Sequence, residues 1–159
     1  MGLMIDSQGS PSVVEFNVRL GDPEAQVTIP LIQSALGELL LAAAEGRVSE
    51  TQVEFNNLHA STGVLASEGY PGAVVNGREI RGWNAEIDEG LTRGFVHLAG
   101  ASMDEGGKLT SNGGRVLSAT GLAPSLRESL EASYQIIGGI TLDGSHYRED
   151  IGFRAISGK

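Results

Sequence analysis

Apolar and polar positions alternate most regularly near the start of the chain. Residues 12–20 carry apolar side chains on one face, and Glu15, Asn17 and Arg19 on the other. Successive side chains of a strand point to opposite faces, so this pattern predicts a strand. Residues 2–5 are also apolar and are separated from it by a polar, turn-forming stretch. We expect two strands whose apolar face belongs to a core.

The next pattern is helical and runs from Asp22 to about Ala44. Asp22 is a candidate N-cap, although it is equally well suited to bind a ligand, and Pro23 would occupy the first helical position. Gly46 is a plausible end of the helix. Because Pro30 lies inside the pattern, we expect it to kink the helix or to divide it into two segments.

Beyond residue 60 the pattern changes to short apolar runs separated by glycine-containing turns. Residues 62–67 and 94–100 predict strands, and Asn76-Gly77 predicts a hairpin turn. Residues 108–121 have the pattern of a strand, an Asn-Gly turn and a second strand.

One long helix is predicted in this part of the chain, over residues 125–139. Ser125 and Glu128 have the spacing of a capping box at its start. The pair Gly138-Gly139 can end it. Residues 146–156 then form a final short segment. The elements together predict an α+β fold.

Residues 46–60 lack periodicity and are the best position for a domain boundary. We divide the chain into an N-terminal unit (1–50), a connection (51–59) and a small α+β domain dominated by short strands (60–156). The 159 residues suffice for one ordinary domain, or for a small domain and part of another.

Composition narrows the function classes. The net charge of −9 argues against broad nucleic-acid binding, which requires many Lys and Arg side chains. The chain has no cysteine, which excludes disulfides, thiolate metal sites and cysteine nucleophiles. Neither a signal peptide nor a membrane-spanning segment is recognisable. We therefore expect a soluble, cytoplasmic protein that binds neither nucleic acid nor membrane.

The polar face of the strand 12–20 is the first candidate site. Glu15 offers a carboxylate and Asn17 a neutral carbonyl oxygen, and both are ligand types that Mg²⁺ prefers. Arg19 can form a forked pair with phosphate oxygens. Such a set suits phosphoryl transfer. On periodicity alone, an ordinary solvated sheet face is the more frequent explanation of the pattern.

The second candidate site is the Asn-Gly-Gly turn that precedes Arg115. Its backbone N–H groups and the guanidinium could bind an anion, although a plain hairpin turn is the commoner explanation. The histidines, His59, His97 and His146, are scattered without metal-ligand spacing, so each is more simply structural or superficial.

Five motifs occur together and in order: "GLMI", "VVEFNVRLGDPEAQ", "ASEGYPG", "TSNGGRVLSATG" and "YREDIGFRAI". With them, residues 2–156 resemble the C-terminal part of phosphoribosylamine–glycine ligases (glycinamide ribonucleotide synthetases). These are ATP-grasp enzymes of purine biosynthesis that join 5-phosphoribosylamine to glycine and convert ATP to ADP and phosphate.

The resemblance implies an architecture and a set of site residues. Residues 1–50 would be the end of an ATP-grasp domain, with strands and a helix, and residues 60–156 a small β-rich, barrel-like domain with one helix. Glu15 and Asn17 would hold Mg²⁺ or Mn²⁺. Arg19 would face the phosphates of ATP as the catalytic and cofactor-binding residue. Asp22 and Arg115 would lie toward the substrates.

Two departures from the family pattern limit these expectations. The family motif Phe-His-Ala-Gly-Thr is replaced by "FVHLAGAS", which puts His97 out of step, and we assign it no role. The N-terminal region that carries the adenine pocket in the family is not in this sequence. We therefore expect no ligation by the chain alone. The alternative is a non-catalytic fragment or assembly module that requires a separate N-terminal half.

Overall fold

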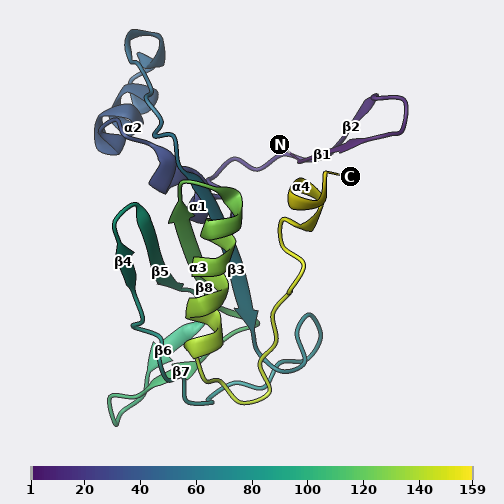
Figure 1. Cartoon of the computed structure of the whole chain (residues 1–159), viewed down its shortest axis with the longest axis vertical. Helices are drawn as coiled ribbons and strands as arrows, with labels where there is room; N and C mark the ends of the chain where they lie inside the picture. Colours follow the sequence, from purple (N-terminus) through teal and green to yellow (C-terminus); the bar gives the residue numbers. More distant parts are fainter. Residues whose placement is uncertain (1, 159) are drawn as a thin grey trace.

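The computed structural model describes residues 2–158, and its centre is a four-stranded antiparallel sheet with the strand order β3-β8-β5-β4. Helix α3 lies along one face of this sheet (Figure 1). A second pair of strands, β6 and β7, forms a small separate sheet. The bounds of these elements are β3 His59–Ala66, β4 Ile87–Glu89, β5 Thr92–Leu98, β6 Ala101–Met103, β7 Leu109–Ser111, β8 Arg115–Ala123 and α3 Leu126–Gly139.

Glycines allow α3 to lie very close to the sheet. A Cβ on Gly121 of β8 would collide with the backbone carbonyl of Ser129 in α3. On the two neighbouring strands, Gly63 and Gly94 leave the space that Ile137 and Ile136 fill. At these three positions, the helix fills the space that the strands leave open, and sheet side chains complete the core. Its buried members are Leu65, Ile80, Leu109, Val116, Leu117, Ala119, Ile136, Ile137 and Leu142.

The sequence signals of α3 are confirmed at its start and its end. The Ser125 hydroxyl accepts a hydrogen bond from the backbone N–H of Glu128 at 3.2 Å and donates to the Glu128 carboxylate at 2.7 Å. Ser125 is therefore the N-cap and Glu128 contacts it, although through the hydroxyl and not through the backbone N–H of a capping box. The helix ends at Gly139, as predicted. Its buried face contains apolar residues and two serines, and one of these, Ser133, donates to the carbonyl of Ala119 at 2.8 Å.

The N-terminal strands β1 (Gly2–Ile5) and β2 (Pro11–Glu15) pair with each other alone and project from the rest of the molecule as a hairpin (Figure 1). The prediction of a strand to residue 20 is wrong, because β2 ends at Glu15. The expected core face is also wrong: Val14 is 65% exposed and Val18 is 99% exposed. Within residues 2–158, nothing covers this arm.

The predicted helix 22–44 is divided, as the position of Pro30 suggested. It consists of α1 (Ala25–Thr28), the 3₁₀ turn η1 (Ile29–Leu31) and α2 (Leu36–Ala44). Asp22 is not the N-cap, because that position belongs to Glu24 and Asp22 caps no backbone N–H.

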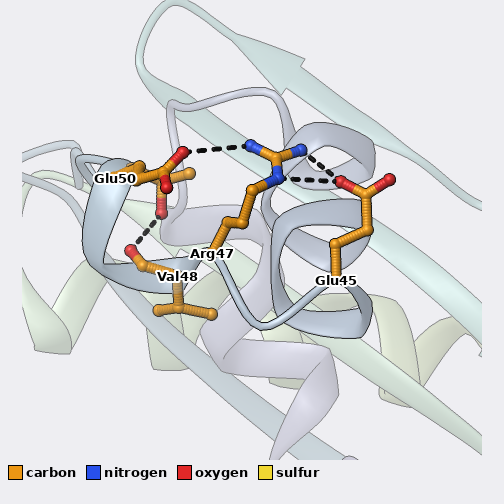
Figure 2. A network of polar contacts seen from close by, with 5 residues as sticks. Glu45, Arg47, Val48 and Glu50 are labelled. Atoms are coloured by element: carbon orange, nitrogen blue, oxygen red, sulfur yellow. Dashed lines mark hydrogen bonds and ion pairs between the residues drawn. The ribbon is translucent and has the colours of Figure 1, made fainter.

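After Gly46, Arg47 holds the end of α2 against the short 3₁₀ turn η2 (Val48–Glu50) (Figure 2). Its guanidinium contacts the carboxylate of Glu45 and lies 3.3 Å from that of Glu50. The Val48 carbonyl accepts the hydroxyl of Thr51 at 2.8 Å. These contacts are exposed, so they contribute little to stability and mainly fix the direction of the chain.

Two predicted hairpin turns are wrong, although the strand, turn and strand expected over residues 108–121 are confirmed as β7, a turn and β8. Asn76-Gly77 joins no pair of strands, and the backbone N–H of Gly77 instead donates to the carbonyl of Ser111. The turn at residues 112–114 connects β7 to β8, which belong to different sheets. In this part of the chain, hairpins form instead between β4 and β5 and between β6 and β7. The first passes through Gly90, whose positive φ fits a tight turn.

In place of the expected barrel-like domain, the structure has an open, mixed α/β arrangement of antiparallel sheets. Strands β3 and β4 are the edges of the larger sheet, and Ala66 at the end of β3 forms a bridge with His146. In the part of the chain that is described, no helix is long and apolar enough to cross a bilayer.

Candidate functional site

The segment from Leu20 to Pro30 packs on the four-stranded sheet and carries Asp22 there, whereas Glu15, Asn17 and Arg19 stay on the exposed chain before it. Gly63 and Gly121 face α3, so Thr120 and His97, which alternate with residues on that face, point to the other side. Helix α1 contacts β3 and β8, and residues 20–30 line a cavity together with His97 and Leu98. The segment 20–30 therefore covers part of the second face of the sheet, over β3 and β8 and beside the end of β5.

Glu15 and Asn17 lie side by side at the base of the hairpin arm, where β2 ends. The Asn17 amide nitrogen donates to one oxygen of the Glu15 carboxylate at 2.9 Å. Among residues 2–158, the second carboxylate oxygen of Glu15 and the amide oxygen of Asn17 have no hydrogen-bond partner. The strand argument that placed them on one face fails beyond residue 15, but the two side chains are still brought together.

Arg19 lies apart from this pair in its hydrogen bonding. Its guanidinium donates to the carbonyl of Leu20 at 2.8 Å, and the side chain is exposed. Four of its five N–H donors are not used by that bond and remain for a ligand. The described structure thus contains the three predicted side chains in one short segment without joining Arg19 to Glu15 and Asn17.

Asp22 and Arg115 are 93 residues apart in sequence and form a direct ion pair. The Arg115 guanidinium donates to the Asp22 carboxylate at 2.9 Å and to the Asp22 carbonyl at 3.0 Å. The other carboxylate oxygen of Asp22 accepts from the Gln26 amide at 2.7 Å. Both carboxylate oxygens are therefore engaged, and Asp22 anchors the segment 20–30 to the start of β8.

Arg115 is held in place by a tightly packed loop behind it. The Ser67 hydroxyl donates to the carbonyl of Gly113 at 2.7 Å, and the Ser67 N–H donates to that of Gly114 at 2.9 Å. The ring of Tyr70 lies so close to Gly114 that a Cβ there would collide with it. The turn 112–114 is thus a fixed connection and not a hairpin turn.

Sequence reasoning missed Gln26 and assigned no role to His97, although both line the cavity of about 410 Å³ beside Asp22. Burial lowers the pKa of the His97 imidazole, so the ring is neutral at pH 7. Its Nδ1 lies 3.5 Å from the Thr120 hydroxyl. The spacing of Asp22 and Gln26, four residues apart, is the sequence signal that could have indicated their contact.

The donor atoms at Glu15 and Asn17 fit a hard cation only in part. Residues 2–158 contain no group of three His, Cys, Asp or Glu side chains placed to hold a metal ion. One carboxylate and one amide oxygen would provide two ligands. Mg²⁺ commonly takes one or two protein carboxylates and completes its shell with water and substrate phosphates, so the pair is compatible with such an ion.

Comparison with known families gives one match within the chain. Residues 60–154 match the family described as "Phosphoribosylglycinamide synthetase, C domain". The match includes Arg115 and the loop that holds it, and it begins after the hairpin arm and the segment 20–30.

Individual relatives extend the similarity to the N-terminal part. The chain is 41% identical over 155 residues to a phosphoribosylamine–glycine ligase of Salmonella typhimurium, which covers 98% of this chain and 35% of the relative. It is 38% identical to the "Bifunctional purine biosynthetic protein purD" of Dictyostelium discoideum, again over 98% of this chain but only 20% of that protein.

A solved structure agrees in fold. The crystal structure of phosphoribosylamine–glycine ligase from Thermotoga maritima matches with a TM-score of 0.70 and 34% identity, over 94% of this chain and 35% of that one. The chain thus spans about a third or less of the length of these relatives.

Proposed function

Because this chain belongs to the phosphoribosylglycinamide synthetase C-domain family, we propose that it is the C-terminal portion of a phosphoribosylamine–glycine ligase. The whole enzyme would join 5-phosphoribosylamine and glycine at the expense of ATP, giving glycinamide ribonucleotide, ADP and phosphate in the cytoplasm. Residues 1–50 would complete an ATP-grasp domain, and residues 60–156 would form the C-terminal domain.

The contact between Glu15 and Asn17 carries the proposed role of the N-terminal segment. A carboxylate and an amide at 2.9 Å, both exposed, offer two oxygen ligands to Mg²⁺ or Mn²⁺. When bound, the ion would neutralise charge on the phosphates of ATP. Arg19 has free donors for the same phosphates.

Asp22 and Arg115 would have different roles toward the substrate. Since the carboxylate of Asp22 is engaged by Arg115 and Gln26, a substrate would reach Arg115 through its remaining donors. Asp22 would orient Arg115, and the loop around Gly114 would hold the backbone of the arginine in place.

The test is activity by reconstitution. The 159-residue chain is mixed with the remaining N-terminal region of the Salmonella relative, and ATP-dependent formation of glycinamide ribonucleotide is measured. We expect no product from the chain alone and product from the mixture. Turnover by the chain alone would contradict the division of labour between the two parts.

The metal role has its own variant. In the reconstituted enzyme, Glu15→Gln removes the only carboxylate of the pair and should lower kcat by about 100-fold or more, because the ion is lost from the phosphates. Glu105→Gln, on an exposed turn, is the matched control. An unchanged kcat for Glu15→Gln would remove Glu15 from the metal site.

The exposed arm favours a second function, that of an assembly module. Apolar side chains rarely stay exposed in such density unless a partner covers them. The exposed set on the arm and its connection is Leu3, Met4, Ile5, Val13, Val14, Phe16, Val18 and Leu20. Co-purification of the chain with a separate N-terminal half would support this role, and failure to associate at micromolar concentration would count against it.

A further inference from the structure

Strand β3 is an edge of the four-stranded sheet, and part of its outer backbone has no partner. The N–H and C=O of Ala66 bond to His146, on the side away from β8. Because backbone groups alternate in direction along a strand, those of Ala60, Thr62 and Val64 also point to this outer side. Among residues 2–158, these three make no backbone hydrogen bond there. Such an edge can pair with one further strand.

An apolar groove of about 440 Å³ lies along this edge at Ala60 and Thr62. Helix α1 lines the groove from one face of the sheet, and α3 lines it from the other together with α4 (Phe153–Ser157) and the residues just before it. A strand added to β3 would therefore bury side chains on both of its faces. The apolar lining residues are Pro23, Val27, Ala60, Leu126, Leu130, Ile151 and Ala155.

The hairpin arm has the pattern of strands that are covered on both faces. Leu3 and Val13 are cross-strand partners and share one face, whereas Met4 and Val14 lie on the other. All four are exposed, from 46% at Leu3 to 65% at Val14. Apolar side chains on both faces are typical of strands inside a covered sheet, and a hairpin of two strands is marginally stable alone. Strand β2 has five residues, the length of the open stretch 60–64.

We propose that the groove at the β3 edge receives the hairpin arm of a second copy of this chain, and that two copies exchange their arms reciprocally. Strand β2 of each copy pairs with β3 of the other. The five large apolar side chains of the arm, Ile5 included, are about half exposed or more. Two exchanged arms would therefore remove on the order of 1,000 Å² of apolar surface from water, before the grooves are counted, which is enough for a specific interface.

The exchange concerns the chain without an N-terminal half, and it does not rest on the proposed reaction. Each copy has a net charge of −9, so two copies repel each other. The dimer should therefore form only at high protein concentration, and added salt should strengthen it because salt screens the repulsion. At low concentration the arm remains free.

Sedimentation equilibrium of the 159-residue chain, from micromolar to millimolar concentration, tests the association. We expect a monomer that converts to a dimer. Val14→Lys puts a charge on the arm and should weaken the dimer about tenfold or more, because the charge would enter an apolar groove. Leu91→Lys, between β4 and β5, changes a side chain that is 66% exposed and is the matched control, which should dimerise as the unaltered chain does. A chain that stays monomeric throughout, or a dimer that Val14→Lys leaves unchanged, would overturn the proposal.

Amide hydrogen exchange locates the contact on β3. The amides of Thr62 and Val64 should become protected as the concentration rises, because they gain a strand partner. Those of Ser61 and Gly63, which face β8, should change little. If the protection of Thr62 and Val64 did not depend on concentration, no second copy would occupy this edge.

An equal mixture of isotope-labelled and unlabelled chains identifies the occupant. Because Val13 and Val14 point to opposite faces of β2, intermolecular NOEs from their methyl groups should reach both walls of the groove, Val27 on α1 and Leu130 on α3. NOEs between the two arms alone would contradict the exchange. The proposed function is tested separately, by reconstitution with the N-terminal region.

Discussion

Val14 and Val116 are both valines on β-strands, but Val14 is 65% exposed and Val116 is fully buried. Strand β8, which carries Val116, has a paired strand on each side and α3 on one face. Strand β2, which carries Val14, has a single neighbour and nothing on its faces within residues 2–158. Alternation thus predicts where an apolar face lies, and the rest of the fold decides whether that face is covered.

The two regions should differ most in how they tolerate a Gly→Ala substitution, which adds one methyl group. Gly121→Ala would place a Cβ against the backbone of Ser129, and neither the central strand nor α3 can move freely. We expect a loss of about 3 kcal/mol or more in the free energy of unfolding. Urea denaturation measures it.

Gly37→Ala is the matched change in the N-terminal part, where a Cβ on α2 meets no atom within 4 Å. It should stabilise α2 by about 0.5–1 kcal/mol through helix propensity, measured by amide hydrogen exchange. If Gly121→Ala were as well tolerated as Gly37→Ala, the close packing of α3 on the sheet would be wrong.

A pair of leucines gives the next largest effect. Leu65→Ala in β3 removes a side chain that is 2% exposed and should lower the free energy of unfolding by about 2–5 kcal/mol. Leu3→Ala in β1 removes a side chain that already contacts water and should change it by less than about 0.5 kcal/mol. Thermal unfolding of both variants tests this, and a large loss from Leu3→Ala would show that the arm is covered in solution.

The Asp22–Arg115 pair joins the two regions, and among residues 2–158 it is the one ion pair that bridges the connection 51–59. Arg115→Lys keeps the charge but loses the forked contact with the Asp22 carboxylate and carbonyl. Because both side chains are partly exposed, the loss should be no more than about 1 kcal/mol.

The effect of Arg115→Lys should also be local. The amide of Ala25, which donates to the carbonyl of Gly21 at 2.9 Å, should exchange faster while the amides of α3 do not. Arg93→Lys, in a looser 3.8 Å pair with Asp88 within one hairpin, is the control. If the Ala25 amide exchanged at the same rate in Arg115→Lys and Arg93→Lys, the Asp22–Arg115 pair would not anchor the segment 20–30.

The accuracy of the sequence predictions also differs between the sheet with α3 and the N-terminal arm. Helix α3 was predicted closely because capping, periodicity and terminal glycines all indicate the same bounds. The strand at 12–20 was predicted too long, since alternation continues to Leu20 although β2 has no partner beyond Glu15. The turn at 112–114 was mistaken for a hairpin because an Asn-Gly signal does not reveal which sheet each flanking strand joins.

The candidate site divides in a similar way. Glu15, Asn17 and Arg19 were found from local pattern and resemblance, and their functional roles stay predictions. The pairing of Asp22 with Arg115 spans 93 residues and depends on how the segment 20–30 crosses the sheet, which no local pattern encodes. Gln26 was missed because its contact with Asp22, and the burial of its amide oxygen without a partner among residues 2–158, are properties of the packed structure alone.

His97 gives the smallest effect, and it reports whether the segment 20–30 stays on the sheet. Burial lowers the pKa of its imidazole from 6.5, so the unfolded chain binds a proton more readily than the folded one. The contribution to stability is therefore complete at neutral pH and above, and it is lost as the pH falls through about 6.5 toward the lower pKa of the folded state. His97→Gln should remove this part of the pH dependence of the free energy of unfolding, measured from pH 7.5 to pH 5, while His59→Gln on the exposed end of β3 is the matched control. An identical pH profile for the unaltered chain and His97→Gln would mean that the imidazole is open to water, and that residues 20–30 do not cover this face of the sheet in solution.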